Sequence, residues 1–303
     1  MDMDEMITEM EGRFKPYGKI SDNYRKIPLT GINREQILET MSRFITVENL
    51  AWQSGHVSGA VYNGEKEHVD FTNKAYSIAS QNNPLHPDVW PSSLKFETEI
   101  VSMVAGMLGG DNKVRGSVTS GGTESILLAM KTYRDLFVDK KGITRPEVIL
   151  PKSAHAAFDK ACHYFGIKPV WTGLDEKFAA DVSDIERHIT ENTVAIVGSA
   201  PCFPYGVVDP IPEIAQIAQE NDVGMHVDAC LGGFILPWAR KLGRKLPDFD
   251  FTLPGVTSIS VDTHKYGYAP KGTSVVLYRN SDFVCCLKDL SGGIHVTIFS
   301  LFK

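Results

Sequence analysis

Lys265 is the residue of this sequence that is best placed for covalent chemistry. It follows an apolar run at residues 258–261, and a histidine, a tyrosine and a glycine surround it in the segment THKYG. A lysine amine that loses its charge through burial or cationic neighbours readily forms a Schiff base with an aldehyde. Most lysines are solvated surface charges, so Lys265 is a candidate because of the segment around it.

Asp228 is a candidate partner for a bound ring. It follows an apolar run at residues 223–227, and a carboxylate at the C-terminal end of a strand faces the crevice where α/β sheets bind ligands. An acid at this place keeps a heteroaromatic nitrogen protonated, as a pyridoxal cofactor requires if its ring is to accept electrons. A cap of the following turn explains a lone aspartate at a strand end equally well.

The segment TSGGTES at residues 119–125 has the composition of an anion-binding turn. Gly121 and Gly122 let the backbone approach an anion closely, and the free N–H groups of the following helix stabilise it. Ser120, Thr123 and Ser125 can add hydroxyl donors. The segment matches neither GxGxxG nor GxxxxGK[ST], so it is not a standard nucleotide loop. The alternative is a tight turn with serine and threonine caps.

His155 lies between a predicted strand at residues 147–150 and the start of a helix. Its imidazole could stack on a flat ring or exchange a proton, but a histidine at a helix start also commonly makes a purely structural hydrogen bond. Each of the four segments is a weak signal alone. Their order along the chain (anion turn, histidine, acid, lysine) is what indicates a site for a phosphorylated aldehyde cofactor.

Strands and helices alternate through the region that carries these residues. Strand-sized apolar runs lie at residues 116–119, 147–150, 168–171, 193–197, 223–227, 258–261 and 274–278. Helices are predicted at residues 94–108, 124–137, 156–165, 181–189 and 211–220. This alternation predicts an α/β fold in which helices cover both faces of a mostly parallel sheet. We expect residues 1–55 to form a helical arm, 56–280 a large domain and 281–303 a divergent tail.

Composition narrows the classes of function. The chain has 303 residues, is 43% hydrophobic and carries a net charge of -6 without a basic block, which argues against nucleic acid and anionic membranes as partners. No secretory signal or transmembrane segment is recognisable, and the five unspaced cysteines indicate reduced thiols rather than disulfides or a metal site. We therefore expect a soluble cytoplasmic protein, and the sequence does not decide between action in its own cell and delivery to another.

Seven segments taken together resemble a known family. They are GSVTSGGTESI (116–126), SAHAAFDKA (153–161), HVDACLGGF (226–234), VDTHKYGYAPKG (261–272), SGAVY (58–62), NPLHPD (83–88) and PCFPYGVVDPI (201–211). This set is similar to the sphingosine-1-phosphate lyases, which belong to the group II decarboxylase branch of the fold type I pyridoxal-phosphate enzymes. The resemblance extends from about residue 50 to about residue 280.

The resemblance implies a role for each candidate residue. Lys265 would carry pyridoxal 5'-phosphate, Asp228 would pair with the pyridine nitrogen, and His155 would stack on the ring. The cofactor phosphate would be held by Gly121, Gly122 and Thr123, with His264 nearby. Tyr62, Asn83 and His86 would bind the substrate phosphate, and Tyr205 and Lys271 would handle a proton at the substrate hydroxyl. Enzymes of this family are homodimers with sites at the subunit interface.

The implied reaction is the retro-aldol cleavage of the C2–C3 bond of a phosphorylated sphingoid base, giving phosphoethanolamine and a long-chain aldehyde. The family's small C-terminal domain has no recognisable counterpart here. Only the segment GGI at residues 292–294 echoes it, so we expect a truncated chain. Two alternatives stay open: an amino-acid decarboxylase of the same fold, and a non-catalytic remnant.

Overall fold

The computed structural model describes residues 2–14, 24–46, 48, 54–57 and 59–284. The chain separates into two units, Met1–Val61 and Tyr62–Lys303. The first unit contains the helices α1 (Met3–Phe14) and α2 (Arg34–Ile45), and the Asn33 side chain caps α2 by accepting a hydrogen bond from the Glu35 N–H at 2.7 Å. Most of the predicted divergent tail, including its glycine pair at 292–293, lies outside the described residues.

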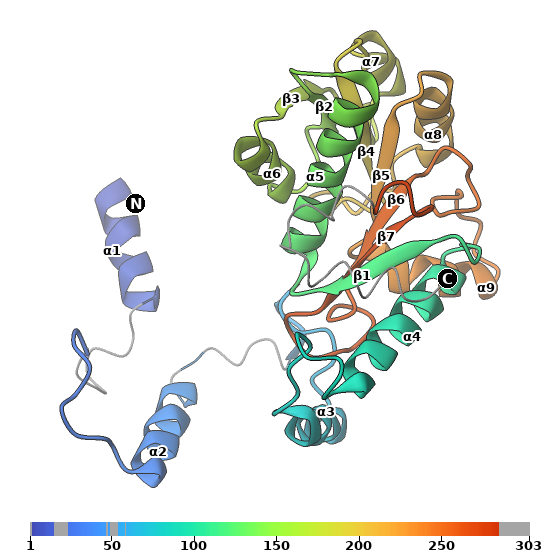
Figure 1. Cartoon of the computed structure of the whole chain (residues 1–303). Coiled ribbons are helices and arrows are strands. Elements are labelled where there is room, and N and C mark those ends of the chain that lie inside the picture. Colours follow the sequence, from blue (N-terminus) through green and yellow to red (C-terminus); the bar gives the residue numbers. More distant parts are fainter. Residues whose placement is uncertain (1, 15–23, 47, 49–53, 58, 285–303) are drawn as a thin grey trace. The chain divides into compact units, whose positions relative to one another are not determined.

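The second unit is built on one seven-stranded sheet (Figure 1). Its strands are β1 (Arg115–Thr119), β2 (Glu147–Pro151), β3 (Lys168–Thr172), β4 (Thr193–Ser199), β5 (Gly224–Asp228), β6 (Ser258–Val261) and β7 (Ser274–Tyr278). Their order is β1-β7-β6-β5-β4-β2-β3. Strand β7 is antiparallel to both of its neighbours, and the other pairs are parallel. All the strands except β7 therefore run in one direction, and the predicted mostly parallel sheet is confirmed.

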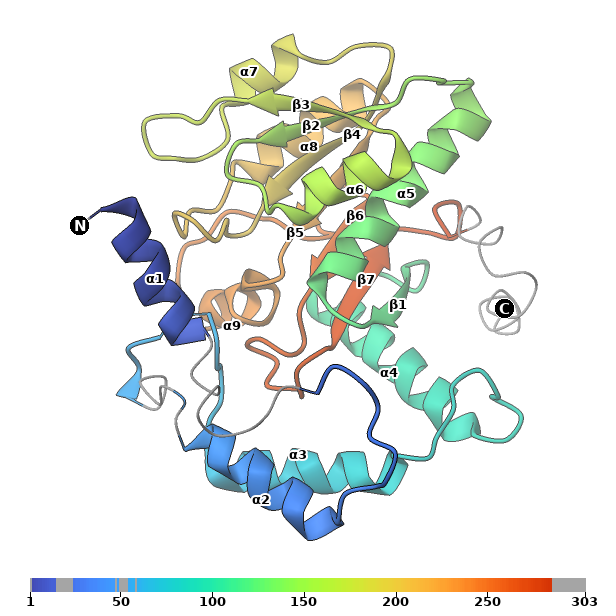
Figure 2. The ribbon, with the colours of Figure 1, turned by 90° about the vertical axis from the view of Figure 1, so that its left-hand side faces the viewer.

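Helices cover both faces of the sheet (Figures 1 and 2). They are α4 (Pro91–Met107), α5 (Gly122–Lys141), α6 (Ala157–Phe165), α7 (Val182–Arg187), α8 (Ile211–Glu220) and α9 (Leu236–Lys241). Helix α3 (Lys66–Ala79) has no buried residue and lies apart from the sheet (Figures 1 and 2). Along β2, Val148 and Leu150 pack into the core under α5 and α6, whereas Ile149 packs into the core under α4 and α8. Because both faces of the inner strands are buried, strands such as β2 and β4 are mostly apolar in the sequence.

The observed elements match most of the predicted ones within a few residues, with one exception. Residues 232–241 form a short 3-10 helix (Gly232–Phe234) followed by α9, and neither was predicted. At Gly232 an added Cβ would lie 2.1 Å from the Ala200 carbonyl oxygen, so the glycine is required by close packing. In the described part of the chain, no helix is both long and apolar enough to cross a bilayer.

A buried polar network links β5 and β6. The ring of His226 is fully buried, and its two nitrogens lie 2.7 Å from Ser258 Oγ and 3.1 Å from Ser260 Oγ. The hydroxyl of Tyr133, also buried, lies 2.6 Å from the same Ser258 Oγ. Hydroxyl partners can bond a neutral imidazole at both nitrogens, which satisfies this histidine without a charge.

We predict that His226 makes stability depend on pH in a defined window. Burial lowers the pKa of His226 to about 4, although the nearby Asp228 opposes the shift. As the pH falls, His226 therefore takes up a proton near pH 6.5 in the unfolded chain but only near pH 4 in the folded chain. The contribution of His226 to the free energy of unfolding is therefore complete above pH 6.5 and is lost as the pH falls to 4. The loss is roughly 3 kcal/mol.

Urea unfolding at several pH values measures this effect. The His226→Asn variant is expected to lose stability less steeply between pH 6.5 and 4 than the parent chain. The exposed His163 provides a matched control, because a His163→Asn change removes a histidine that is not desolvated. Equal slopes in all three proteins would contradict the assignment.

Candidate active site

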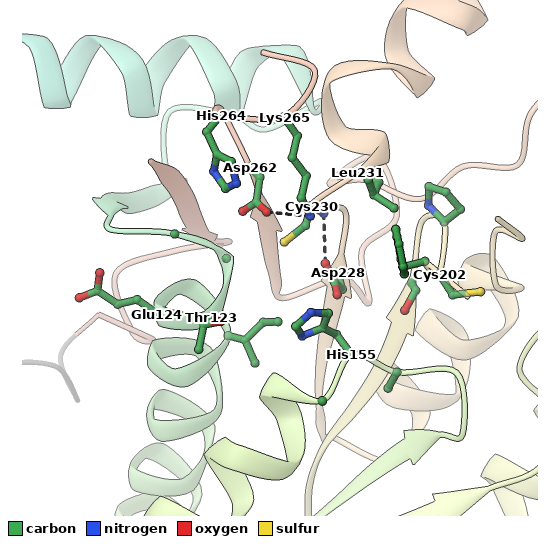
Figure 3. A pocket seen from close by; sticks show the side chains of 18 of the residues that line it. Thr123, Glu124, His155, Cys202, Asp228, Cys230, Leu231, Asp262, His264 and Lys265 are labelled. Atoms are coloured by element: carbon green, nitrogen blue, oxygen red, sulfur yellow. Dashed lines mark hydrogen bonds and ion pairs between the residues drawn. The ribbon is translucent and has the colours of Figure 1, made fainter. Parts of the chain in front are cut away.

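A cavity of about 600 Å³ lies at the carboxyl ends of the parallel strands (Figure 3). Ser199 and Asp228 end β4 and β5 there, and Asp262 directly follows β6. Ligands of open α/β sheets bind at this edge, and the volume suits a small cofactor. Seven of the predicted residues line this one cavity: Gly121, Gly122, Thr123, His155, Asp228, His264 and Lys265.

The predicted anion turn forms the start of α5. Gly121 precedes the helix with φ 153°. Because glycine has no side chain, it cannot cap the first N–H groups of α5. Gly122 is in close contact with Asp262, because an added Cβ would lie 2.8 Å from Oδ1 of that carboxylate. The turn therefore combines the N–H groups of a helix start with a backbone that favours glycine, and the Ser120 N–H donates to the Glu124 carboxylate at 2.6 Å.

A chain of buried hydroxyl groups fixes this turn to the strand that leads to Lys265. Ser125 Oγ lies 2.7 Å from Thr119 Oγ1 and 2.8 Å from Ser274 Oγ, and Ser274 donates to the Val261 carbonyl oxygen at 3.0 Å. Ser125 is fully buried. We expected its hydroxyl to be a possible anion donor, but the structure uses it to join α5 to β1 and β7.

Lys265 points into the cavity and forms an ion pair that the sequence did not reveal. Its Nζ lies 2.9 Å from Oδ2 of Asp262, and its side chain is 22% exposed (Figure 3). Burial lowers the pKa of Lys265, but Cys230, Asp262 and Asp228 together outweigh burial and raise it above its ordinary value. The free amine is therefore held as an ammonium and must lose a proton before it can act as a nucleophile.

Asp228 is buried at the end of β5, where the backbone N–H of Cys230 donates to its Oδ1 at 3.1 Å. The Cys230 thiol lies between the acids and the lysine, and burial raises its pKa well above the ordinary value, with Asp228 acting in the same direction. Cys230 is therefore a neutral thiol at neutral pH, where the carboxylates carry the negative charge of this part of the cavity. The effect of Cys230 on the Lys265 amine belongs to the alkaline range in which both groups titrate.

Two histidines lie at the cavity wall with fixed orientations. His155 Nδ1 accepts a hydrogen bond from the Ala157 N–H at 3.1 Å. His155 therefore makes the structural hydrogen bond expected at a helix start and also lines the cavity. His264 Nδ1 donates to the Thr273 carbonyl oxygen at 2.6 Å. In neutral imidazoles, these bonds put the proton of His155 on Nε2 and that of His264 on Nδ1.

Five predicted residues lie outside the cavity wall. The ring of Tyr62 is 4.9 Å from that of Tyr266, and Lys271 Nζ lies 5.3 Å from the Tyr62 ring centre. Burial raises the pKa of Tyr62, against the opposing charge of Lys265. Tyr62 and Lys271 are thus neighbours of each other beside the Lys265 loop.

Tyr205 and the predicted residues of the loop between α3 and α4 make contacts of their own outside the cavity wall. The Tyr205 ring stacks on Phe178 with centres 4.6 Å apart. In the α3–α4 loop, Asn83 Oδ1 accepts a hydrogen bond from the Leu85 N–H at 3.0 Å, and the His86 ring lies 6.4 Å from that of Trp90. The substrate roles expected for these residues remain predictions.

Asp262 was not among the site residues predicted from the sequence. The residue was part of the Lys265 segment, and two signals mark it: it follows a buried strand, as Asp228 does, and it precedes the lysine by three residues. An acid at this spacing reaches the lysine when the strand is followed by a turn. The turn is present, because the Lys265 N–H donates to the Asp262 carbonyl oxygen at 3.2 Å.

Comparison with known proteins adds three findings. A family model described as the pyridoxal-dependent decarboxylase conserved domain matches residues 22–290. The sphingosine-1-phosphate lyase of Dictyostelium discoideum is 51% identical over 273 residues, which are 90% of this chain and 51% of that protein. The L-aspartate/L-glutamate decarboxylase of Pyrococcus horikoshii is 36% identical over 266 residues, which are 88% of this chain and 67% of that one.

A solved structure supports the same comparison. The sphingosine-1-phosphate lyase of Burkholderia pseudomallei superposes with a TM-score of 0.87 and 42% identity, over 90% of this chain and 64% of that one. The predicted fold is thereby confirmed. The chain spans about half the length of the curated sphingosine-1-phosphate lyases that it matches.

Proposed function

Because this chain belongs to the pyridoxal-dependent decarboxylase family and is homologous to its sphingosine-1-phosphate lyases, we propose that it cleaves a phosphorylated sphingoid base. The products are phosphoethanolamine and a long-chain aldehyde. The observation that carries the proposal is the single cavity that joins Lys265, Asp228 and the glycine turn at the start of α5.

The residues of the cavity fit pyridoxal phosphate, the cofactor of this family. The first turn of α5 offers backbone N–H groups to a phosphate, and the contact of Gly122 with Asp262 leaves no room for a side chain at this turn. A buried carboxylate at position 228 suits a protonated ring nitrogen. A lysine amine reaches into the same cavity, as an aldehyde cofactor requires.

Each residue has a separate task in the proposed reaction. When bound, pyridoxal phosphate supplies an aldehyde that condenses with amines and a ring that accepts the electron pair of a breaking bond. Lys265 would hold the cofactor through its amine. Asp228 would keep the ring nitrogen protonated, and His155 would lie against the ring. Gly121, Gly122 and Thr123 bind the phosphate, with His264 beside them.

The remaining predicted residues serve the substrate. Tyr205 and Lys271 are our candidates for taking the proton of the C3 hydroxyl as the C2–C3 bond breaks. Tyr62, Asn83 and His86 are our candidates for the substrate phosphate. In a homodimer with its sites at the subunit interface, the loop that carries Asn83 and His86 can serve the cavity of the second subunit. We therefore propose a homodimer. The free buried thiols of Cys162 and Cys202 support a reducing, cytoplasmic compartment.

A comparison of two classes of substrate, a phosphorylated sphingoid base and amino acids, tests the proposed function. We expect aldehyde release from sphingosine 1-phosphate and no carbon dioxide release from glutamate, aspartate or aromatic amino acids. The second candidate, amino-acid decarboxylation, is favoured by the 36% identity to the Pyrococcus enzyme. Carbon dioxide without aldehyde would establish that activity instead. A protein that binds the cofactor and releases neither product would be a non-catalytic remnant.

We predict that Gly122→Ala weakens cofactor binding about tenfold, or roughly 1.4 kcal/mol. The added methyl group would lie 2.8 Å from the Asp262 carboxylate, so either the turn or the carboxylate must shift. Fluorescence titration of the apoprotein with pyridoxal phosphate measures the change. Gly106→Ala in α4 is the matched control, because nothing lies within 4 Å of a Cβ there. Unchanged affinity in the Gly122 variant would show that the turn does not hold the phosphate.

A further inference from the structure

Asp262 is a buried carboxylate that the proposed reaction does not use. Its side chain is 4% exposed, and Oδ2 pairs with Lys265 Nζ at 2.9 Å. The other oxygen, Oδ1, is buried and has no hydrogen-bond partner among the described residues. A buried polar atom without a partner is unfavourable, because it has lost its hydrogen bond to water and gained none in the fold. The fold keeps this carboxylate at a place where its main contact is the lysine.

The surroundings of Asp262 fix its position on two sides. On one side is Gly122, where an added Cβ would lie within 2.9 Å of both carboxylate oxygens. On the other side is the turn in which the Lys265 N–H donates to the Asp262 carbonyl oxygen at 3.2 Å. The carboxylate therefore holds the lysine amine next to the start of α5, between the anion turn and the end of β6 (Figure 3).

The charge of Asp262 also affects the lysine proton. The pKa of Lys265 is lowered by burial, but it is raised more strongly by its neighbours, of which Asp262 is the one in hydrogen-bond contact. Cys230, Asp228 and Tyr62 are the other titratable groups that act on the amine. Among these, Asp262 combines negative charge with direct contact. Its removal should therefore change both the position of the amine and its pKa.

We propose that Asp262 is a positioning residue for Lys265, holding the free ammonium beside the anion turn whenever the lysine is not bonded to the cofactor. The amine would then be presented to the cofactor from one fixed place, once its proton has passed to solvent. This inference rests on the proposed role of Lys265, but it concerns another residue and a state of the protein without cofactor.

Competitive acetylation of the apoprotein tests the charge effect without cofactor or activity. Acetic anhydride labels only the neutral amine, so peptide mass spectrometry across a pH series gives the midpoint for Lys265. We expect a lower midpoint in Asp262→Asn than in the parent protein. Asp250→Asn is the matched control, because Asp250 is an equally buried aspartate paired with Arg240 outside the cavity. An Asp262→Asn midpoint equal to that of the parent would overturn the proposal.

A second variant separates position from charge. Asp262→Glu keeps the carboxylate but moves it by one methylene, so the Lys265 midpoint should stay high while the rate of cofactor capture, followed by absorbance, falls about tenfold. Capture at the parent rate by both Asp262 variants would overturn the positioning role. Failure of the proposed function would look different, because the parent protein would then release no aldehyde from sphingosine 1-phosphate. The acetylation midpoints and the rate of cofactor capture do not depend on that product.

Discussion

Lys265→Ala is expected to abolish the visible absorbance of cofactor-loaded protein and to lower the rate of aldehyde release at least about a thousandfold. The amine is the group of the cavity that can bond to an aldehyde, and alanine leaves the acid, the histidines and the anion turn in place. Cofactor held by its phosphate alone would keep the spectrum of the free aldehyde. The absorbance spectrum therefore reports the loss directly, even if the residual affinity is appreciable.

Lys177→Ala is the control for this experiment. Lys177 is an exposed lysine in a loop and is not among the residues that line the cavity, so its replacement should leave both spectrum and rate unchanged. A visible band of parental strength in the Lys265 variant would mean that another lysine carries the cofactor. The site described above would then be wrong.

Asp228→Asn should have the second largest effect, a fall in rate of about a hundredfold or more. The carboxylate lies buried at the end of β5, and asparagine preserves its size while removing the charge that keeps a ring nitrogen protonated. Cofactor should still bond to Lys265 in this variant, because the lysine and the anion turn are untouched. We therefore expect the visible band to persist while aldehyde release is lost.

Asp250→Asn serves as control here too, since it removes a buried charge outside the cavity. It should lower stability without slowing the reaction. If Asp228→Asn kept the parental rate, the carboxylate would have no part in electron withdrawal, and the turn-cap explanation of Asp228 would be correct.

The fold was largely predictable because its strands are buried on both faces. Residues 275–278 are apolar, and the predicted run 274–278 agrees with the bounds of the observed strand β7. The start of α5 was less predictable. The helix was expected from residue 124, but it begins at Gly122, because Gly122 belongs both to the anion turn and to the first helical turn. The helix α9 was missed since Pro237 and the glycines before it suggest a loop.

The candidate site was predictable where residues follow strands. The carboxyl ends of parallel strands meet at one edge, so Asp228 and Lys265 were expected to come together, and both line one cavity. The role of Asp262 could not be derived from spacing alone, because its pairing depends on the turn after β6. Contacts between chains are also invisible in a single sequence, so the substrate roles of Asn83 and His86 remain predictions. The resemblance to the sphingosine-1-phosphate lyases is confirmed by the relatives.

The most direct test is to map where the cofactor bonds. The protein is saturated with pyridoxal phosphate, reduced with borohydride to make the bond permanent, digested and analysed by peptide mass spectrometry. We predict that the cofactor mass is found on the peptide that contains Lys265. Its appearance on a different lysine, or its absence from every peptide of the folded and saturated protein, would contradict our central claim.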